Sequence, residues 1–192
     1  VGADLFISLH ANANKSRKAF GIETYYLNFS KNDKAAAVAA RENGTSLKQV
    51  SDLELILFDL MANAKINESS RLAAHVQKEI CGNLKGRYSQ VRDKGVKQAP
   101  FRVLVGAYMP AVLIELGFLS HAEEERRLGD RSYQRQLAQA LGDALSSLLD
   151  RLRDADGALP DLHLGFTSAD AGLAGPSAPV WSPRSSSRDL RN

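Results

Sequence analysis

The sequence predicts an α/β fold in which helices cover both faces of a partly parallel sheet. Short apolar or β-branched segments, at residues 5–10, 21–27, 101–105 and 110–117, have the length of strands. Longer amphipathic segments with a helical period lie between the second and third of them and after the last. The composition, 44% hydrophobic and 24% charged, is that of a globular chain and excludes wholesale disorder. Strands that alternate with helices favour an α/β sheet.

Composition also excludes several classes of function. The chain has no run of about 18 apolar residues, so we expect no membrane span. A single cysteine, Cys81, rules out a disulfide framework and a Cys-based zinc site within the chain. The net charge of +3 is too small to predict a nucleic-acid partner, and we expect none.

Residues 5–10 form a nearly continuous apolar run, typical of a parallel strand buried on both faces. A small, polar loop follows. Residues 21–27 are β-branched and aromatic, and we predict a strand nearer an edge of the sheet. Residues 101–105 and 110–117 are predicted as further strands, with Pro110 at the start of the last, where a missing N–H is tolerated.

The helices are predicted from their start signals and apolar stripes. Residues 34–43 are rich in alanine, follow a capping-box-like start and stop before Gly44. Residues 53–61 carry an apolar stripe at i, i+3, i+4, i+7 and i+8. The periodic positions of residues 68–84 recur every four residues.

The C-terminal half adds two helices and a tail. A short helix is predicted over residues 123–128, and a long leucine-striped one over 132–153 that covers the sheet. Residues 154–192 combine prolines, glycines and a serine run, and we predict a flexible tail. One domain over residues 1–153 remains. The chain starts without Met and enters a strand almost at once, so we expect a fragment that lacks an upstream part.

Two polar residues stand at the ends of apolar strands. His10 closes the first strand and Glu115 lies near the end of the last. Ligands of open α/β sheets bind beyond the carboxyl ends of strands. A histidine and a carboxylate at one rim can serve a metal hydrolase. The alternatives are a hydrogen-bonded core role for His10, and a salt bridge from Glu115 to Arg102 or Arg92.

Three segments together resemble one enzyme family. Residues 3–13 (ADLFISLHANA), 21–26 (GIETYY) and 109–120 (MPAVLIELGFLS) resemble, in order and spacing, the zinc-dependent N-acetylmuramoyl-L-alanine amidases of the amidase-3 type. The similarity covers residues 1–152. It implies hydrolysis of the amide between N-acetylmuramic acid and the first L-alanine of the stem peptide in peptidoglycan. It also implies Zn²⁺ as cofactor and a sheet whose first strands are missing here.

The resemblance assigns roles to the two strand-end residues. His10 would be a zinc ligand and Glu115 the catalytic carboxylate. The family's other zinc ligands, a histidine in a Gly-His-Gly-rich turn and a glutamate, lie upstream of the SLHANA segment, and this sequence contains neither. We therefore expect this chain alone to bind zinc poorly and catalyse little. The family commonly has Asn at position 121, and we expect His121 to face solvent at a helix start.

Residues 29–66 are longer than the connection in many such amidases and carry two helical patterns. This resembles the cell-division branch, in which an inserted helix blocks the active site until an activator withdraws it. By that resemblance Glu42 is the autoinhibitory zinc-binding residue, a protein activator binds residues 29–66, and the protein is periplasmic or otherwise exported. The alternatives are a solvated Glu42 on a surface helix, and a non-catalytic peptidoglycan-binding or interaction module.

Overall fold

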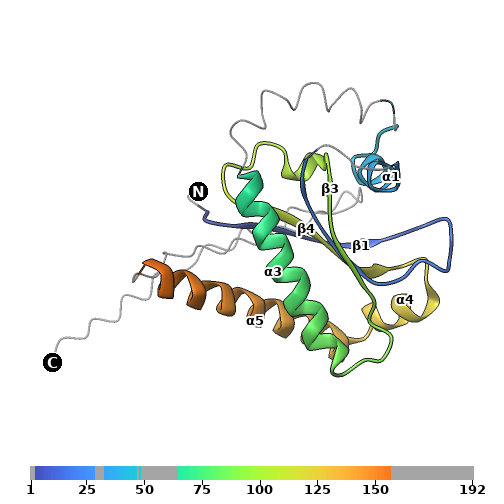
Figure 1. The fold of residues 1–192 in the computed structure, drawn as a ribbon. Coiled ribbons are helices and arrows are strands. Elements are labelled where there is room, and N and C mark those ends of the chain that lie inside the picture. The colour runs from blue at the N-terminus through green and yellow to red at the C-terminus, as the bar shows by residue number, and fades with distance from the viewer. Residues whose placement is uncertain (1–2, 29–32, 47, 49–64, 157–192) are drawn as a thin grey trace, which may run out of the picture.

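The computed structural model describes residues 3–28, 33–46, 48 and 65–156 (Figure 1). Within these residues a mixed four-stranded sheet has the order β1-β4-β2-β3. Its strands are β1 (Phe6–Asn12), β2 (Ile22–Leu27), β3 (Asp93–Ala99) and β4 (Ala111–Phe118). The helices are α1 (Asp33–Glu42), α3 (Ile66–Lys85), the 3₁₀ helix η1 (Arg102–Leu104), α4 (Ala122–Leu128) and α5 (Arg131–Asp156).

The strand directions confirm a partly parallel α/β sheet. Strands β1 and β4 pair in parallel, as do β2 and β3, whereas β2 and β4 are antiparallel. The carboxyl ends of β1 and β4 therefore meet at one edge, and the amino end of β2 meets them there. This arrangement positions side chains from three strands around one rim.

Each face of the sheet carries its own hydrophobic layer. Side chains alternate between faces along a strand, so Val112 and Ile114 of β4 pack with α3 and α5, while Leu113 packs on the opposite side. That opposite layer contains Tyr25 and Phe101, whose rings lie 4.9 Å apart, and is covered by α1 and η1. The prediction of helices on both faces is confirmed (Figure 1).

The helix patterns correspond to observed helices at α1, α3, α4 and α5. The four-residue steps of α3 are buried, at Leu72, Val76, Ile80 and Leu84. Cys81 is buried on the same helix, as a small apolar residue would be. The predicted helix over residues 53–61 and the tail beyond residue 156 lie outside the described residues.

The strand predicted at residues 101–105 is wrong. This segment forms η1, and its apolar residues Phe101 and Leu104 are three apart so that both enter the α1-side layer. The actual third strand, β3, was not predicted, because Lys94, Gly95, Lys97 and Gln98 make its sequence polar. A polar sequence is compatible with β3 because it is an edge strand of the described sheet.

The positions predicted for the first two strands are also corrected. β2 is not near an edge but lies between β4 and β3, which explains why almost all of its residues are buried. β1 is not buried on both faces, since it forms an edge of the described sheet and Leu9 is 50% exposed. An apolar run indicates that a strand is buried, but it does not indicate which neighbouring elements cover it.

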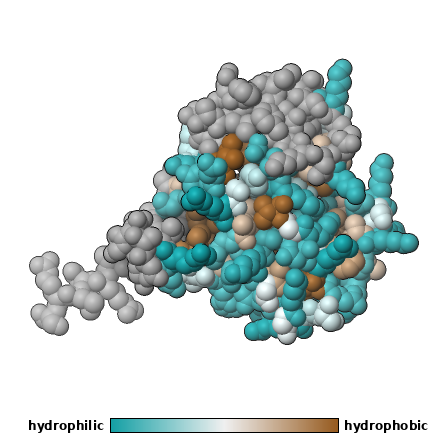
Figure 2. All heavy atoms as spheres, viewed as in Figure 1, coloured by the Kyte–Doolittle hydropathy of each residue, from teal (hydrophilic) through white to brown (hydrophobic). Residues whose placement is uncertain are grey.

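The described surface is mainly hydrophilic. Figure 2 shows separate apolar spots on one face rather than a continuous apolar band. The large exposed apolar side chains of the described residues are Leu9, Val103, Tyr108 and Leu119. No helix in the described part of the chain has the length and apolar character needed to cross a membrane.

Candidate metal centre

Three side chains capable of binding a metal ion converge at the rim formed by β1 and β4. One ligand atom each from His10, Glu42 and Glu115 lies within 4.8 Å of the others. His10 and Glu115 are register partners in the parallel pair of β1 and β4, so their side chains leave the same face. Glu42 is the last residue of α1, which covers that face. The structure thus brings together all three residues singled out from the sequence.

Glu115 is a fully buried carboxylate without a hydrogen-bond partner. Its exposed fraction is 0%, and neither oxygen has a partner among the described residues. Burial raises the pKa of Glu115 to about 7, with a further contribution from the nearby Glu42 carboxylate, while His10 opposes the shift. The alternative salt bridge to Arg102 or Arg92 is not present in the described structure.

His10 and Glu42 form a direct contact. The His10 Nδ1 and Glu42 Oε2 atoms are 3.0 Å apart, and the Glu42 side chain is only 23% exposed. This hydrogen bond is the main cause that raises the pKa of His10 and lowers the pKa of Glu42, while burial opposes both shifts. Glu42 as a whole residue is exposed, as on a surface helix, while its carboxylate contacts His10.

Helix α1 is held over the centre by packing and by polar contacts at its C-terminal end. Ala35, Ala39 and Ala40 are buried, the first two of them against the layer that contains Tyr25 and Phe101. Alanine is the best helix former and its small size lets the helix approach the sheet closely. The packing therefore fixes the height of α1 above the sheet and carries Glu42 to the rim.

The segment around Glu42 carries the polar contacts. Arg41 donates a hydrogen bond of 2.6 Å to Oδ1 of Asn12. The Asn43 side chain donates to the Pro100 carbonyl at 3.0 Å and accepts from the Arg102 backbone N–H at 2.8 Å. Contacts on both sides of Glu42 therefore leave its carboxylate little freedom to turn away from His10.

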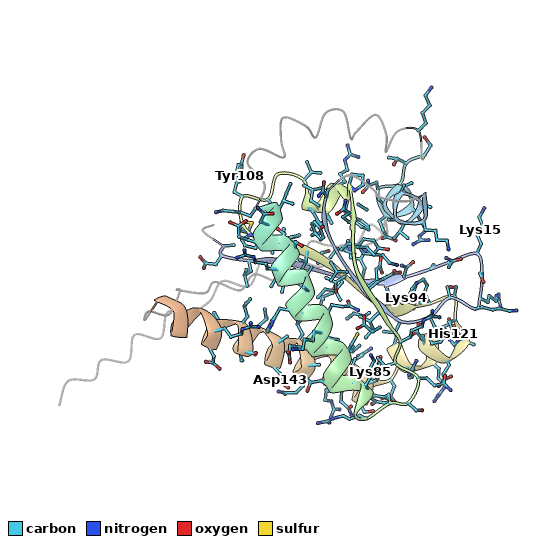
Figure 3. All side chains as sticks on the ribbon, in the orientation of Figure 1. Lys15, Lys85, Lys94, Tyr108, His121 and Asp143 are labelled. Atoms are coloured by element: carbon cyan, nitrogen blue, oxygen red, sulfur yellow. The ribbon has the colours of Figure 1, made fainter. Side chains whose placement is uncertain are left out.

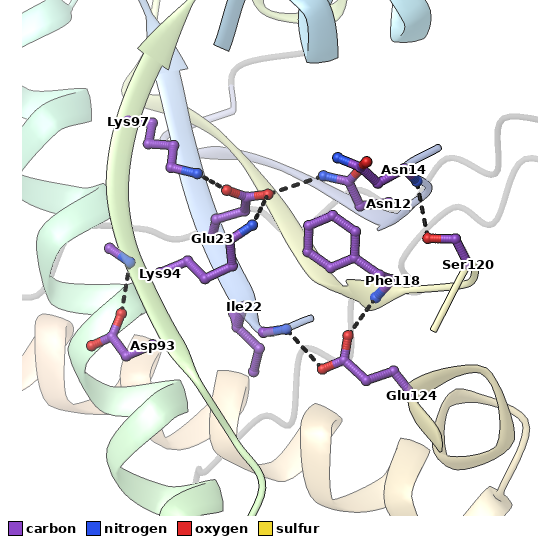
Figure 4. Close-up of polar contacts among 12 residues, drawn as sticks. Asn12, Asn14, Ile22, Glu23, Asp93, Lys94, Lys97, Phe118, Ser120 and Glu124 are labelled. Atoms are coloured by element: carbon purple, nitrogen blue, oxygen red, sulfur yellow. Dashed lines mark hydrogen bonds and ion pairs between the residues drawn. The ribbon is translucent and has the colours of Figure 1, made fainter. Parts of the chain in front are cut away.

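A second buried carboxylate, Glu23, was missed from the sequence. It is 1% exposed and lies opposite Glu115 in the antiparallel pair of β2 and β4. Asn12 donates to it at 3.1 Å, and the ammonium groups of Lys94 and Lys97 pair with its two oxygens (Figure 4). Alternation within residues 21–27 puts Glu23 on one face with Tyr25, but the sequence holds no signal that β2 adjoins β4.

His121 does not belong to the donor group. It precedes α4 outside the donor group, and is half-buried against the Phe20 ring at 5.3 Å rather than facing solvent as expected (Figure 3). The α4 helix instead supplies Glu124, whose carboxylate accepts from the backbone N–H groups of Gly21 and Phe118 (Figure 4). Glu124 thereby holds the start of β2 against the end of β4 beside the centre.

The donor set fits a divalent metal ion. One imidazole and two carboxylates are ligands that Zn²⁺ accepts, and an unpartnered buried carboxylate is costly unless a cation or proton neutralises it. Glu115 is such a carboxylate: both of its oxygens lack partners among the described residues, and its pKa is raised. A carboxyl group with a pKa near 7 could transfer protons beside a cation bound at this centre.

Comparison with known proteins gives one consistent result. A family model described as N-acetylmuramoyl-L-alanine amidase matches residues 1–147. The chain is 32% identical over 155 residues to N-acetylmuramoyl-L-alanine amidase AmiA of Escherichia coli K12, covering 76% of this chain and 52% of AmiA. It is 30% identical over 156 residues to AmiC of Neisseria meningitidis, covering 77% of this chain and 36% of AmiC. The chain thus spans about half or less of these relatives.

The structural comparison agrees. The crystal structure of N-acetylmuramoyl-L-alanine amidase from Clostridium difficile 630 matches with a TM-score of 0.52 and 32% sequence identity. The match covers 77% of this chain and 59% of that chain.

Proposed function

Because this chain belongs to the N-acetylmuramoyl-L-alanine amidase family, we propose that it is part of a peptidoglycan hydrolase. The bond cleaved is the amide between N-acetylmuramic acid and the L-alanine of the stem peptide. The observation that carries the proposal is the buried, unpartnered Glu115 next to His10 at the carboxyl ends of two adjacent parallel strands. Peptidoglycan lies outside the cytoplasmic membrane, so we propose an exported protein of the periplasm or cell envelope.

Glu115 acts as the general base and acid in this proposal. A carboxyl group whose pKa is about 7 can accept a proton from the attacking water and return it to the leaving amine at neutral pH. Hydrogen bonds to the carboxylate would lower that pKa and weaken it as a base. The lack of partners at both oxygens therefore suits the role.

His10 is the metal ligand that this chain itself provides in the proposal. Zinc, held by His10 together with the further ligands that the family resemblance implies, would polarise the scissile carbonyl and lower the pKa of water. His10 keeps its imidazole beside Glu115 because the two residues are paired in register across β1 and β4. The pairing supports the proposal, because it sets the His10 imidazole beside the Glu115 carboxyl group.

A regulatory role of α1 is favoured by the contact between Glu42 and His10. The Glu42 carboxylate lies 3.0 Å from the imidazole and within the donor group, where it would occupy a ligand position that the reaction needs. We propose that α1 is an autoinhibitory element within residues 29–66, and that a protein activator withdraws it. Daughter-cell separation is the process that this branch resemblance implies.

The test is hydrolysis of dye-labelled peptidoglycan by the protein expressed from its complete gene. We expect zinc-dependent dye release that EDTA stops and added Zn²⁺ restores, with free L-alanine amino termini appearing in the peptide fraction. A non-catalytic peptidoglycan-binding module would sediment with peptidoglycan without generating these termini. That outcome would overturn the proposed reaction.

A further inference from the structure

A second polar site adjoins the candidate metal centre. A cavity of about 230 Å³ lies between α1 and the sheet. Four of its lining side chains are cationic, and they come from both walls: Lys34 and Arg41 from α1, Lys94 and Lys97 from β3. The remaining walls include the rings of Tyr25 and Phe118.

Positive charge exceeds negative charge in this cavity. Glu23 is the one carboxylate among the described lining residues, and it is shared by Lys94 and Lys97 (Figure 4). Arg41 is partly balanced by Glu42, whose Oε1 lies 3.4 Å away. Burial and the nearby Arg92 lower the pKa of Lys94, the carboxylates of Glu124 and Glu115 oppose that shift, and Lys34 adds a smaller lowering. An added anion would therefore be attracted to this cavity.

The two β3 lysines are partly desolvated. Burial is the main cause that lowers the pKa of both Lys94 and Lys97. The Lys94 ammonium also lies 4.2 Å from the centroid of the Phe118 ring. Desolvated ammonium groups bind a carboxylate more strongly than fully hydrated ones, because less water must be displaced.

Three residues at or beside the cavity are next to residues of the candidate metal centre. Glu23 lies opposite Glu115 in register, Arg41 precedes Glu42, and Asn12, which contacts both Glu23 and Arg41, lies two residues after His10. A ligand whose amide is at the centre would extend into this cavity after only a few bonds. Its ring walls suit a short aliphatic chain and its lysines suit a carboxylate.

We propose that this cavity binds a carboxylate of the acidic peptide that is attached through the scissile amide. The inference rests on the proposed function and names its substrate recognition. Lys94 and Lys97 form the principal contact because they belong to the sheet and stay in place when α1 moves. Lys34 contributes a weaker, longer-range attraction from α1.

The test is calorimetric binding of two dipeptides to the protein expressed from its complete gene, in the presence of EDTA. One probe is L-Ala-D-Glu and the other is L-Ala-D-Gln amide, which has the same free amino terminus but no carboxylate. We expect L-Ala-D-Glu to bind about tenfold or more tightly than the amide, a preference that falls with added salt. Lys97→Met should reduce that preference about tenfold and Lys34→Met about threefold, consistent with charged hydrogen bonds and screened charges respectively.

Lys85→Met is the matched control, because Lys85 is exposed at the end of α3 and does not line the cavity. It should bind L-Ala-D-Glu like the unmodified protein. Equal binding of the two dipeptides would overturn the proposal. Unchanged selectivity in Lys34→Met would also overturn the proposal. This variant leaves the Glu23 ion pairs intact, so the test remains valid if Lys97→Met does not fold.

Binding in EDTA needs no hydrolysis, which separates this inference from the proposed function. Selective dipeptide binding without any amide cleavage would remove the proposed reaction and leave the carboxylate site standing. Amide cleavage without selective binding would remove the carboxylate site alone.

Discussion

Glu115 is the residue on which the proposed chemistry depends. Its carboxyl group is buried at the rim of the sheet, and burial raises its pKa to about 7. A group with this pKa exchanges a proton readily at neutral pH. The same burial makes the charged form unfavourable, so an ionised Glu115 lowers the stability of the fold.

In the proposed reaction Glu115 transfers protons and is not a zinc ligand, so we expect Glu115→Gln to abolish hydrolysis while zinc stays bound. The amide keeps the shape of the side chain but cannot accept the proton, so activity should fall by about two to four orders of magnitude. Dye release and zinc content, measured on the same preparation, check the prediction. Glu125→Gln, on the exposed side of α4, is the control and should keep full activity. Activity of Glu115→Gln within a few-fold of the unmodified protein would remove Glu115 from the mechanism.

His10→Ala is expected to lower zinc occupancy as well as activity. The imidazole supplies the one nitrogen donor of the described group, and a catalytic zinc site commonly keeps three protein ligands. Metal analysis after gel filtration measures the loss. His75→Ala is the control for loss of a histidine, because His75 bonds the Ala144 carbonyl in the core, away from the metal centre. Stoichiometric zinc in purified His10→Ala would show that His10 is not a ligand.

Helix α1 packs on the sheet through alanines and makes polar contacts at its C-terminal end. Its alanines pack on the sheet, Arg41 and Glu42 contact Asn12 and His10 at the rim, and Asn43 bonds Pro100 and Arg102 beyond the carboxyl end of β3. The proposed autoinhibition requires two positions of α1 whose free energies differ by a few kcal/mol. The balance between the positions then depends on single side chains.

Glu42→Ala is expected to raise basal activity without an activator. The substitution removes the carboxylate from the donor group but keeps the alanine packing, so activation should be partial. Each loss of about 1.4 kcal/mol from the closed position raises the open fraction roughly tenfold while that fraction is small. Dye release without any activator measures the effect, and Glu68→Ala, at the exposed start of α3, is the control. Unchanged basal release with zinc and fold intact would leave α1 as a partner-docking element only.

At the scale of the whole molecule, the buried centre links stability to pH. In the metal-free protein the folded state holds the Glu115 proton up to about pH 7, whereas the unfolded state releases it near the ordinary value of 4.5. The stabilising contribution of the protonated form is therefore complete below pH 4.5 and is lost as pH rises toward 7. The linked loss is on the order of 3 kcal/mol.

Denaturation by urea in EDTA, at pH 5 and pH 8, tests this linkage. Glu115→Gln cannot ionise, so it should be closer in stability to the unmodified protein at pH 5 and clearly more stable than it at pH 8. Comparison of the two proteins at each pH cancels the titration of groups remote from Glu115, whereas His10 and Glu42 are coupled to Glu115 and contribute to the difference. A stability difference that does not change with pH would contradict the raised pKa of Glu115.

The fold could be predicted where the pattern was local. The apolar stripe of α3 and the leucines of α5 indicate which face of each helix is buried. The apolar runs of β1 and β4 indicate that both are strands of a sheet. His10 and Glu115 were recognisable because each follows directly from an apolar run. Hydrophobic periodicity is written in neighbouring residues, so these features needed no tertiary information.

Only the tertiary structure decided which strands are neighbours. The polar β3 pairs with β2, and β2 lies antiparallel to β4, which sets Glu23 opposite Glu115. It also decided that α1 packs where Glu42 meets His10, a contact between residues 32 positions apart. Contacts of this kind depend on the burial that the whole chain achieves at once. A local sequence pattern can state that a side chain must be covered, but the assembled fold alone selects the partner that covers it.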